Sequence, residues 1–190
     1  MSSCLSCRKN NEQTLNSIKN LTNKPSILYP KSMNLETQVI TALIDQNLTL
    51  ALAESCTGGL LGHRLTNISG SSKAIQASLV TYSNEAKNMI LDISKQVIEQ
   101  KGAVSDEVAT QMAQNVREKL KANFGIGISG IAGPSGGTKS KPVGLTYICV
   151  CTEKESLTLK CVFPGSREKV KKQAADKALE ILLEFLETPA

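Results

Sequence analysis

The segment that most constrains the fold of this chain is Leu48 to Arg64, which reads Leu-Thr-Leu-Ala-Leu-Ala-Glu-Ser-Cys-Thr-Gly-Gly-Leu-Leu-Gly-His-Arg. Its first half is short, apolar and suited to a β-strand, and its second half has leucines at helical spacing. Between them stand Ser55, Cys56, Thr57 and two glycines, which predict a sharp turn. A hydroxyl on such a turn faces the positive end of a helix dipole, where an anion or a developing oxyanion is stabilised. Ser55 is therefore the first candidate for chemistry.

Strand-like and helix-like segments alternate along the rest of the chain. Apolar runs that favour strands occupy residues 48–54, 77–82, 124–129, 143–152 and 156–163, and the segments around them have helical periodicity. Only a polar turn separates the last two runs, so they are expected to form an antiparallel pair. The pattern predicts an α/β fold, a three-layer α/β/α sandwich with a mixed, mainly parallel sheet of about five strands.

Residues 1–33 differ in composition from the rest of the chain. They are rich in Ser, Asn, Lys and Thr and have no sustained period, so we expect a disordered N-terminal extension followed by one domain at 34–188. Five Lys and Arg residues and one Glu give residues 1–32 a charge of +4, which leaves +1 of the total +5 for the remainder. A nearly neutral domain argues against direct nucleic-acid binding.

Membrane insertion, secretion and metal binding are not expected. No apolar run approaches the roughly 18 residues of a membrane span, and the first residues contain no continuous apolar stretch typical of a signal peptide. Six cysteines without such a signal indicate reduced thiols in a cytoplasmic protein. The pair Cys4 and Cys7 lacks a second pair of ligands, and His63 is the only histidine, so we expect no metal site there.

A Ser-His-Asp triad does not fit these residues. His63 follows Ser55 by eight residues within the same predicted helix, about 12 Å along its axis. A lysine can serve as the base instead when burial leaves its amine neutral. Lys87 stands one short turn after the predicted strand 77–82, and Tyr82 at the end of that strand could relay a proton between Lys87 and Ser55. Both side chains could equally be ordinary surface residues.

A glycine-rich loop and one arginine offer further ligand contacts. Residues 129–142 contain four glycines and Pro134, which let backbone N–H groups approach a ligand, although a flexible connector would also fit. Arg167 stands at the start of the final predicted helix, a position suited to an anion. The carboxyl ends of parallel strands meet at one edge of a sheet, so Ser55, Tyr82 and this loop are expected to lie together.

Six motifs, taken together, resemble the CinA C-terminal domain family, the group of nicotinamide-nucleotide amidohydrolases (NMN deamidases). They occur in one colinear order over about residues 35–187: Ala-Glu-Ser-Cys-Thr-Gly-Gly at 53–59, Val-Thr-Tyr-Ser-Asn-Glu-Ala-Lys at 80–87, Gly-Ala-Val-Ser at 102–105, Ser-Gly-Ile-Ala-Gly-Pro at 129–134, Lys-Pro-Val-Gly at 141–144 and Phe-Pro-Gly-Ser-Arg at 163–167. The motifs at 53–59 and 129–134 are the most specific of the six. CinA-type proteins also carry a large N-terminal domain, and the short lead-in here favours the stand-alone deamidase form.

The resemblance implies hydrolysis of nicotinamide mononucleotide (NMN) to nicotinate mononucleotide and ammonia, within pyridine-nucleotide recycling, and a homo-oligomer. It implies catalysis by Ser55, Tyr82 and Lys87, with no metal or cofactor. Substrate contacts are expected from the turn and the loop, with turn N–H groups stabilising the oxyanion and the loop and Arg167 holding the ribose phosphate: Cys56, Thr57, Gly58, Gly130, Ile131, Ala132, Gly133 and Arg167.

Two other functions are compatible with the same resemblance. CinA-type proteins are linked to DNA uptake and recombination, so a relative that had lost activity would act as a non-catalytic partner module. A simple nucleotide-binding domain would need the glycine loop but no activated serine. Because Ser55, Tyr82 and Lys87 are all present, we favour the enzyme.

Overall fold

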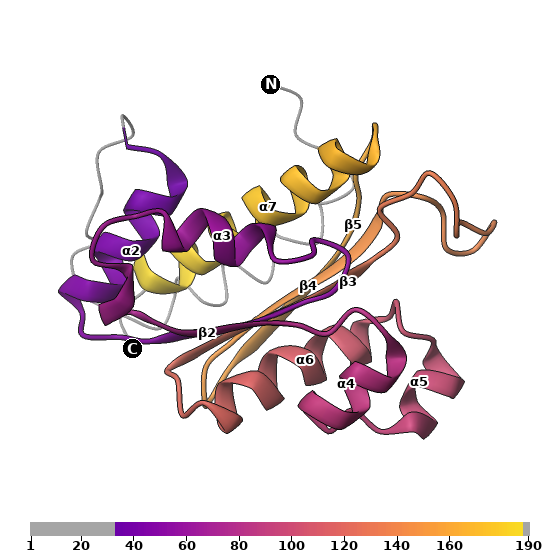
Figure 1. Cartoon of the computed structure of the whole chain (residues 1–190), viewed down its shortest axis with the longest axis horizontal. Coiled ribbons are helices and arrows are strands. Elements are labelled where there is room, and N and C mark those ends of the chain that lie inside the picture. The colour runs from indigo at the N-terminus through magenta and orange to yellow at the C-terminus, as the bar shows by residue number, and fades with distance from the viewer. Residues whose placement is uncertain (1–32, 188–190) are drawn as a thin grey trace.

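A computed structural model describes residues 33–187 of the chain (Figure 1). The predictions for the N-terminal extension, its basic charge and the pair Cys4 and Cys7 concern residues outside this range. The described residues form a five-stranded sheet with helices on both faces, which confirms the predicted three-layer α/β sandwich (Figure 1).

The sheet is mixed, as the alternation of segments predicts. The strands lie in the order β2-β1-β3-β4-β5, and β1 pairs in parallel with both β2 and β3. Because β4 is antiparallel to β3 and to β5, four strands run in one direction and β4 alone runs against them. Their bounds are Leu50–Glu54 (β1), Ile75–Val80 (β2), Phe124–Gly130 (β3), Leu145–Cys151 (β4) and Ser156–Val162 (β5).

Helices cover the two faces of the sheet in two groups of three (Figure 1). The first group is α2 (Leu35–Asp45), α3 (Leu60–Thr66) and α7 (Arg167–Glu187), and the second is α4 (Asn84–Leu91), α5 (Lys95–Lys101) and α6 (Asp106–Lys119). A short 3₁₀ turn, Ser71–Lys73, precedes β2. No helix within residues 33–187 has the length and apolar character that a membrane crossing requires.

The central strand β1 shows why the sheet needs cover on both sides. All five of its residues are buried. Leu50 and Leu52 join the core beneath α2 and α7, whereas Ala51 and Ala53 join the core beneath α6, because alternate side chains of a strand point to opposite faces. A strand buried on both faces is expected to be apolar throughout, as this one is until Glu54.

Two glycines in β3 let α6 pack directly on the sheet. A Cβ atom at Gly125 would lie 2.1 Å from the carbonyl oxygen of Ala113, and one at Gly127 would lie 2.2 Å from that of Ala109. Any side chain at these positions would push α6 away. This close packing sets the position of β3, whose C-terminal end borders the candidate site.

Candidate active site

The turn after β1 has the position that the sequence predicts, and α3 begins at Leu60, directly after the two glycines. Gly58 and Gly59 adopt left-handed φ values of 62° and 89°, which bend the chain before the helix starts. The N–H of Gly58 donates to the carbonyl of Ser55 at 3.0 Å and closes the turn. Ser55 directly follows the last residue of β1, so it lies at the carboxyl edge of the sheet, where it is 8% exposed.

Glu54 stabilises this turn, and the sequence analysis missed its role. Its carboxylate is fully buried and accepts hydrogen bonds from the N–H groups of Gly59 (3.0 Å), Leu61 (3.1 Å) and Gly62 (2.8 Å), and from the hydroxyl of Ser78 (3.1 Å). The start of α3 is thus neutralised by the protein itself and is not free for a ligand. An acid as the last residue of a buried strand before a helix was the signal, because a helix N-terminus favours negative charge.

The structure brings Lys87 to Ser55, although they are 32 residues apart in sequence. Ser83 caps α4 by accepting from the N–H of Ala86 at 3.0 Å, which places Lys87 in the first turns of this helix. Its Nζ lies 2.9 Å from Ser55 Oγ, and the lysine side chain is only 1% exposed. This direct contact is the geometry expected of a nucleophile and its base.

The surroundings of Lys87 favour the neutral amine. Its Nζ also lies 2.9 Å from the carbonyl oxygen of Thr81 and 3.4 Å from that of Tyr82. A neutral amine has two N–H donors for these carbonyls and one lone pair for the proton of Ser55. Burial lowers the pKa of Lys87, and no carboxylate within residues 33–187 forms an ion pair with it to oppose this effect.

Tyr82 is not placed as the predicted relay. Its side chain is 59% exposed, and its hydroxyl accepts a hydrogen bond from Arg167 Nη2 at 2.6 Å. Arg167 Nη1 also donates to the carbonyl of Gly133 at 2.8 Å. Since Lys87 contacts Ser55 directly, no intermediate group is needed between them. Tyr82 and Arg167 instead connect the end of β2, the glycine loop and the start of α7 at the rim of the site.

Two amides of the turn have no backbone acceptor. The N–H groups of Cys56 and Thr57 donate to no other residue's backbone in the described chain, whereas the N–H of Gly58, the third amide that the sequence suggested, donates to Ser55. The Thr57 hydroxyl is also buried without a hydrogen-bond partner among residues 33–187. Burial raises the pKa of the Cys56 thiol to about 11, so this neighbour of Ser55 stays uncharged at neutral pH.

The root of the glycine loop packs against the serine turn. A Cβ atom at Gly130 would lie 3.0 Å from Cys56 Sγ, so only glycine lets the two segments come this close. The N–H of Ile131 donates to the carbonyl of Leu145 at 2.8 Å, and its own carbonyl accepts from the N–H of Gly144 at 2.7 Å. The loop is therefore tied to β4 at its base, and Ala132 and Gly133 beyond it are buried.

His63 lies away from this site, as its position in the sequence predicts. It is exposed on α3, and its Nε2 lies 3.2 Å from Nδ2 of Asn67. Within residues 33–187, no group of three or more His, Cys, Asp or Glu side chains is arranged to hold a metal ion.

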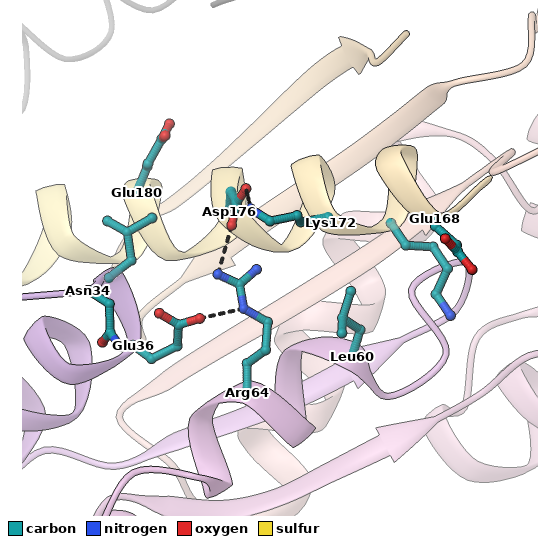
Figure 2. A pocket seen from close by; sticks show the side chains of 10 residues that line it. Asn34, Glu36, Leu60, Arg64, Glu168, Lys172, Asp176 and Glu180 are labelled. Atoms are coloured by element: carbon teal, nitrogen blue, oxygen red, sulfur yellow. Dashed lines mark hydrogen bonds and ion pairs between the residues drawn. The ribbon is translucent and has the colours of Figure 1, made fainter. Parts of the chain in front are cut away.

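A separate cleft of about 840 Å³ runs between α2, α3 and α7 (Figure 2). Arg64 lies at its centre and pairs with Glu36 (2.5 Å) and Asp176 (2.7 Å), which ties the three helices together. The cleft contains none of Ser55, Tyr82 and Lys87 in its lining, and it meets the active-site turn only where Leu60 and Lys171 border it. We assign the chemistry to the serine turn, and the Arg64 pairs to the packing of the helices.

Comparison with known proteins gives a consistent family match. The family model of the CinA C-terminal domain matches residues 32–186. A "CinA-like protein" of Prochlorococcus marinus is 50% identical over 136 residues, 71% of this chain and 32% of that protein, and one of Acidobacterium capsulatum is 44% identical over 157 residues, 82% of this chain and 38% of that protein. The chain thus matches about a third of the length of these curated relatives.

Solved structures agree with this match. The crystal structure of the competence/damage inducible protein CihA from Agrobacterium tumefaciens has 35% sequence identity and a TM-score of 0.76, over 82% of this chain and 96% of that one. A structure of a competence-damaged protein (CinA) superfamily protein from Enterobacter cloacae has 31% identity and a TM-score of 0.78, over 86% and 99% of the two chains.

Proposed function

This chain belongs to the CinA C-terminal domain family, and from that premise we propose that it is a nicotinamide-nucleotide amidohydrolase that converts NMN and water to nicotinate mononucleotide and ammonia. The observation that carries the proposal is the 2.9 Å contact between Ser55 Oγ and the buried Nζ of Lys87. Burial lowers the pKa of Lys87 and so favours the neutral amine, the form that can accept a proton from Ser55.

The first half of the reaction forms an acyl-enzyme. Lys87 takes the hydroxyl proton while Ser55 Oγ attacks the carboxamide carbon of the substrate. The negative charge that develops on the carboxamide oxygen would be stabilised by the N–H groups of Cys56 and Thr57, which donate to no other residue's backbone in the described chain. The tetrahedral intermediate then breaks its C–N bond, Lys87 returns the proton to the nitrogen, and ammonia leaves.

The second half of the reaction regenerates the enzyme. A water molecule takes the place of the ammonia and gives a proton to Lys87 as it attacks the ester carbon. Collapse of this second intermediate breaks the bond to Ser55 Oγ, which recovers its proton, and nicotinate mononucleotide is released. Arg167 has N–H donors beyond those used for Tyr82 and Gly133, and with the loop of residues 130–137 it would contact the phosphorylated ribose.

A second candidate, a non-catalytic partner module, is suggested by the names of the relatives, which refer to competence and damage. In that case the Ser55–Lys87 contact would have only a structural role. The two candidates differ in whether Ser55 becomes acylated, and this difference can be measured.

The deciding experiment measures ammonia release from NMN by the purified chain and by the variants Ser55→Ala and Lys87→Ala. Lys95→Ala is the matched control, since Lys95 is an exposed lysine on α5. We expect both site variants to lose activity by a factor on the order of 10³ or more while the control is unchanged. A well-folded wild type that neither releases ammonia nor is labelled at Ser55 by an acylating probe would favour the partner module. An active Lys87→Ala variant would refute the assignment of the base.

A further inference from the structure

We propose that Lys171 binds the phosphate group of the substrate and makes the site selective for nucleotides over nucleosides, an inference that rests on the proposed function. Lys171 belongs to none of the sequence motifs described above. It lies on α7 four residues after Arg167, so the two cations share one face of that helix.

The position of Lys171 connects it to the catalytic turn. Its Nζ would lie 3.4 Å from a Cβ atom at Gly58, which means that the ammonium group touches the turn that presents Ser55. The hydrogen bond from Gly58 N to Ser55 O makes these two residues the ends of one tight turn. Lys171 therefore lies beside the turn that carries the nucleophile, at the opposite end of that turn from Ser55.

Lys171 has no anionic partner in the described chain, whereas two other lysines of α7 do. Lys172 pairs with Asp176 at 2.8 Å and Lys177 with Glu180 at 3.0 Å, but no ion pair within residues 33–187 includes Lys171. Its side chain is half-buried. A lysine held in this way keeps its N–H donors for a ligand without first having to break an internal ion pair.

The charges around the turn select an anion. Glu54 is the nearest acid to the turn in sequence, and its carboxylate is already occupied by four donors. Glu168 on the first turn of α7 also lines the cleft (Figure 2), and as an acid without an ion pair in the described chain it opposes an anion there. Lys171 and Arg167 together outweigh this single carboxylate, and two cations suit a phosphate monoester with its charge of nearly −2.

The test compares Lys171→Gln with Lys172→Gln, a matched control that neutralises the adjacent exposed lysine. Ammonia release is measured with NMN and with its riboside, which lacks the phosphate. We expect Lys171→Gln to raise KM for NMN on the order of 10- to 100-fold with kcat little changed, and to leave kcat/KM for the riboside unchanged, because one charged hydrogen bond is lost. Lys172→Gln should resemble the wild type with both substrates.

Inorganic phosphate gives a second readout that does not need the riboside to react. It should inhibit the wild type competitively, and Lys171→Gln should weaken this inhibition by a similar factor. Equal losses with NMN and riboside, or unchanged constants with both, would overturn the assignment of Lys171.

A wild type that releases no ammonia from either compound would refute the proposed function and leave Lys171 to be judged by binding. Calorimetric titration of the folded protein would then decide. Tighter binding of NMN than of the riboside, with the difference lost in Lys171→Gln, supports the phosphate contact, and equal binding of the two by the wild type overturns it.

Discussion

Replacing Glu54 with glutamine tests how the serine turn is held. Glu54 Oε2 accepts from the N–H groups of Gly59 and Leu61, and Oε1 accepts from the N–H of Gly62 and the hydroxyl of Ser78. A glutamine has one oxygen for these donors, and its NH₂ group must face the others. The least costly orientation turns the NH₂ toward Ser78, whose hydroxyl can rotate to accept, and leaves the N–H of Gly62 without an acceptor.

The magnitude follows from this count. One buried N–H without an acceptor costs about 1–3 kcal/mol, and the two hydrogen bonds that remain lose their charge assistance, roughly 1 kcal/mol each. Because glutamine also removes a buried charge, part of this loss is offset. We expect Glu54→Gln to lower the free energy of unfolding by roughly 2–4 kcal/mol, a large share of the 5–15 kcal/mol typical of a domain.

Urea unfolding followed by far-ultraviolet circular dichroism measures this change, since the chain has no tryptophan for fluorescence. Ser78→Ala is the control, because it removes a single neutral donor and should cost about 1 kcal/mol. In the Ser78→Ala background the glutamine NH₂ loses its acceptor, so Glu54→Gln should cost about 1 kcal/mol more than in the wild type. A loss below about 0.5 kcal/mol for Glu54→Gln would refute the role given to the carboxylate.

Four further predictions concern the site and the core. Lys87→Met should abolish labelling of Ser55 by an acylating probe, because the base that contacts Ser55 is lost. The same variant should raise the free energy of unfolding at neutral pH by about 1 kcal/mol, because it removes a buried amine. A variant that is destabilised but still reactive would contradict both expectations. Because burial lowers the pKa of Lys87, the unfolded chain binds one more proton at this lysine than the folded chain does at pH values between the folded-state pKa and 10.5. The free energy of unfolding and the acylation rate should therefore both rise with pH as Lys87 loses its proton. A flat pH–rate profile would count against a lysine base. Tyr82→Phe should reduce kcat less than about 10-fold and act mainly on KM through Arg167, and a loss beyond about 100-fold in kcat would restore Tyr82 as a proton relay. Gly127→Ala should lower the free energy of unfolding, measured in urea, by about 3 kcal/mol or more, because its Cβ would meet the backbone of α6. A variant as stable as the wild type would contradict the close packing of α6 on β3.

Local patterns in the chain were enough to predict the layers of the fold and the place of the nucleophile. The apolar run of β1, the glycines after Ser55 and the helical spacing beyond them are all encoded within a few residues of one another. The carboxyl ends of parallel strands share an edge in any such sheet, which made Lys87 a candidate base for Ser55, but only the structure gives their 2.9 Å contact. These features depend on spacing, and spacing is visible in a sequence.

What only the tertiary structure decided depends on atoms that are distant in sequence. The hydrogen bond of the Ser78 hydroxyl to Glu54 joins two neighbouring strands across 24 positions, and the hydrogen bond of Tyr82 to Arg167 joins residues 85 positions apart. The contact of Lys171 with the turn at Gly58 arises because α7 packs beside α3. No local period encodes such contacts. They follow from how α7, the loop and the sheet edge pack, which determines which donors and cations remain free for a substrate.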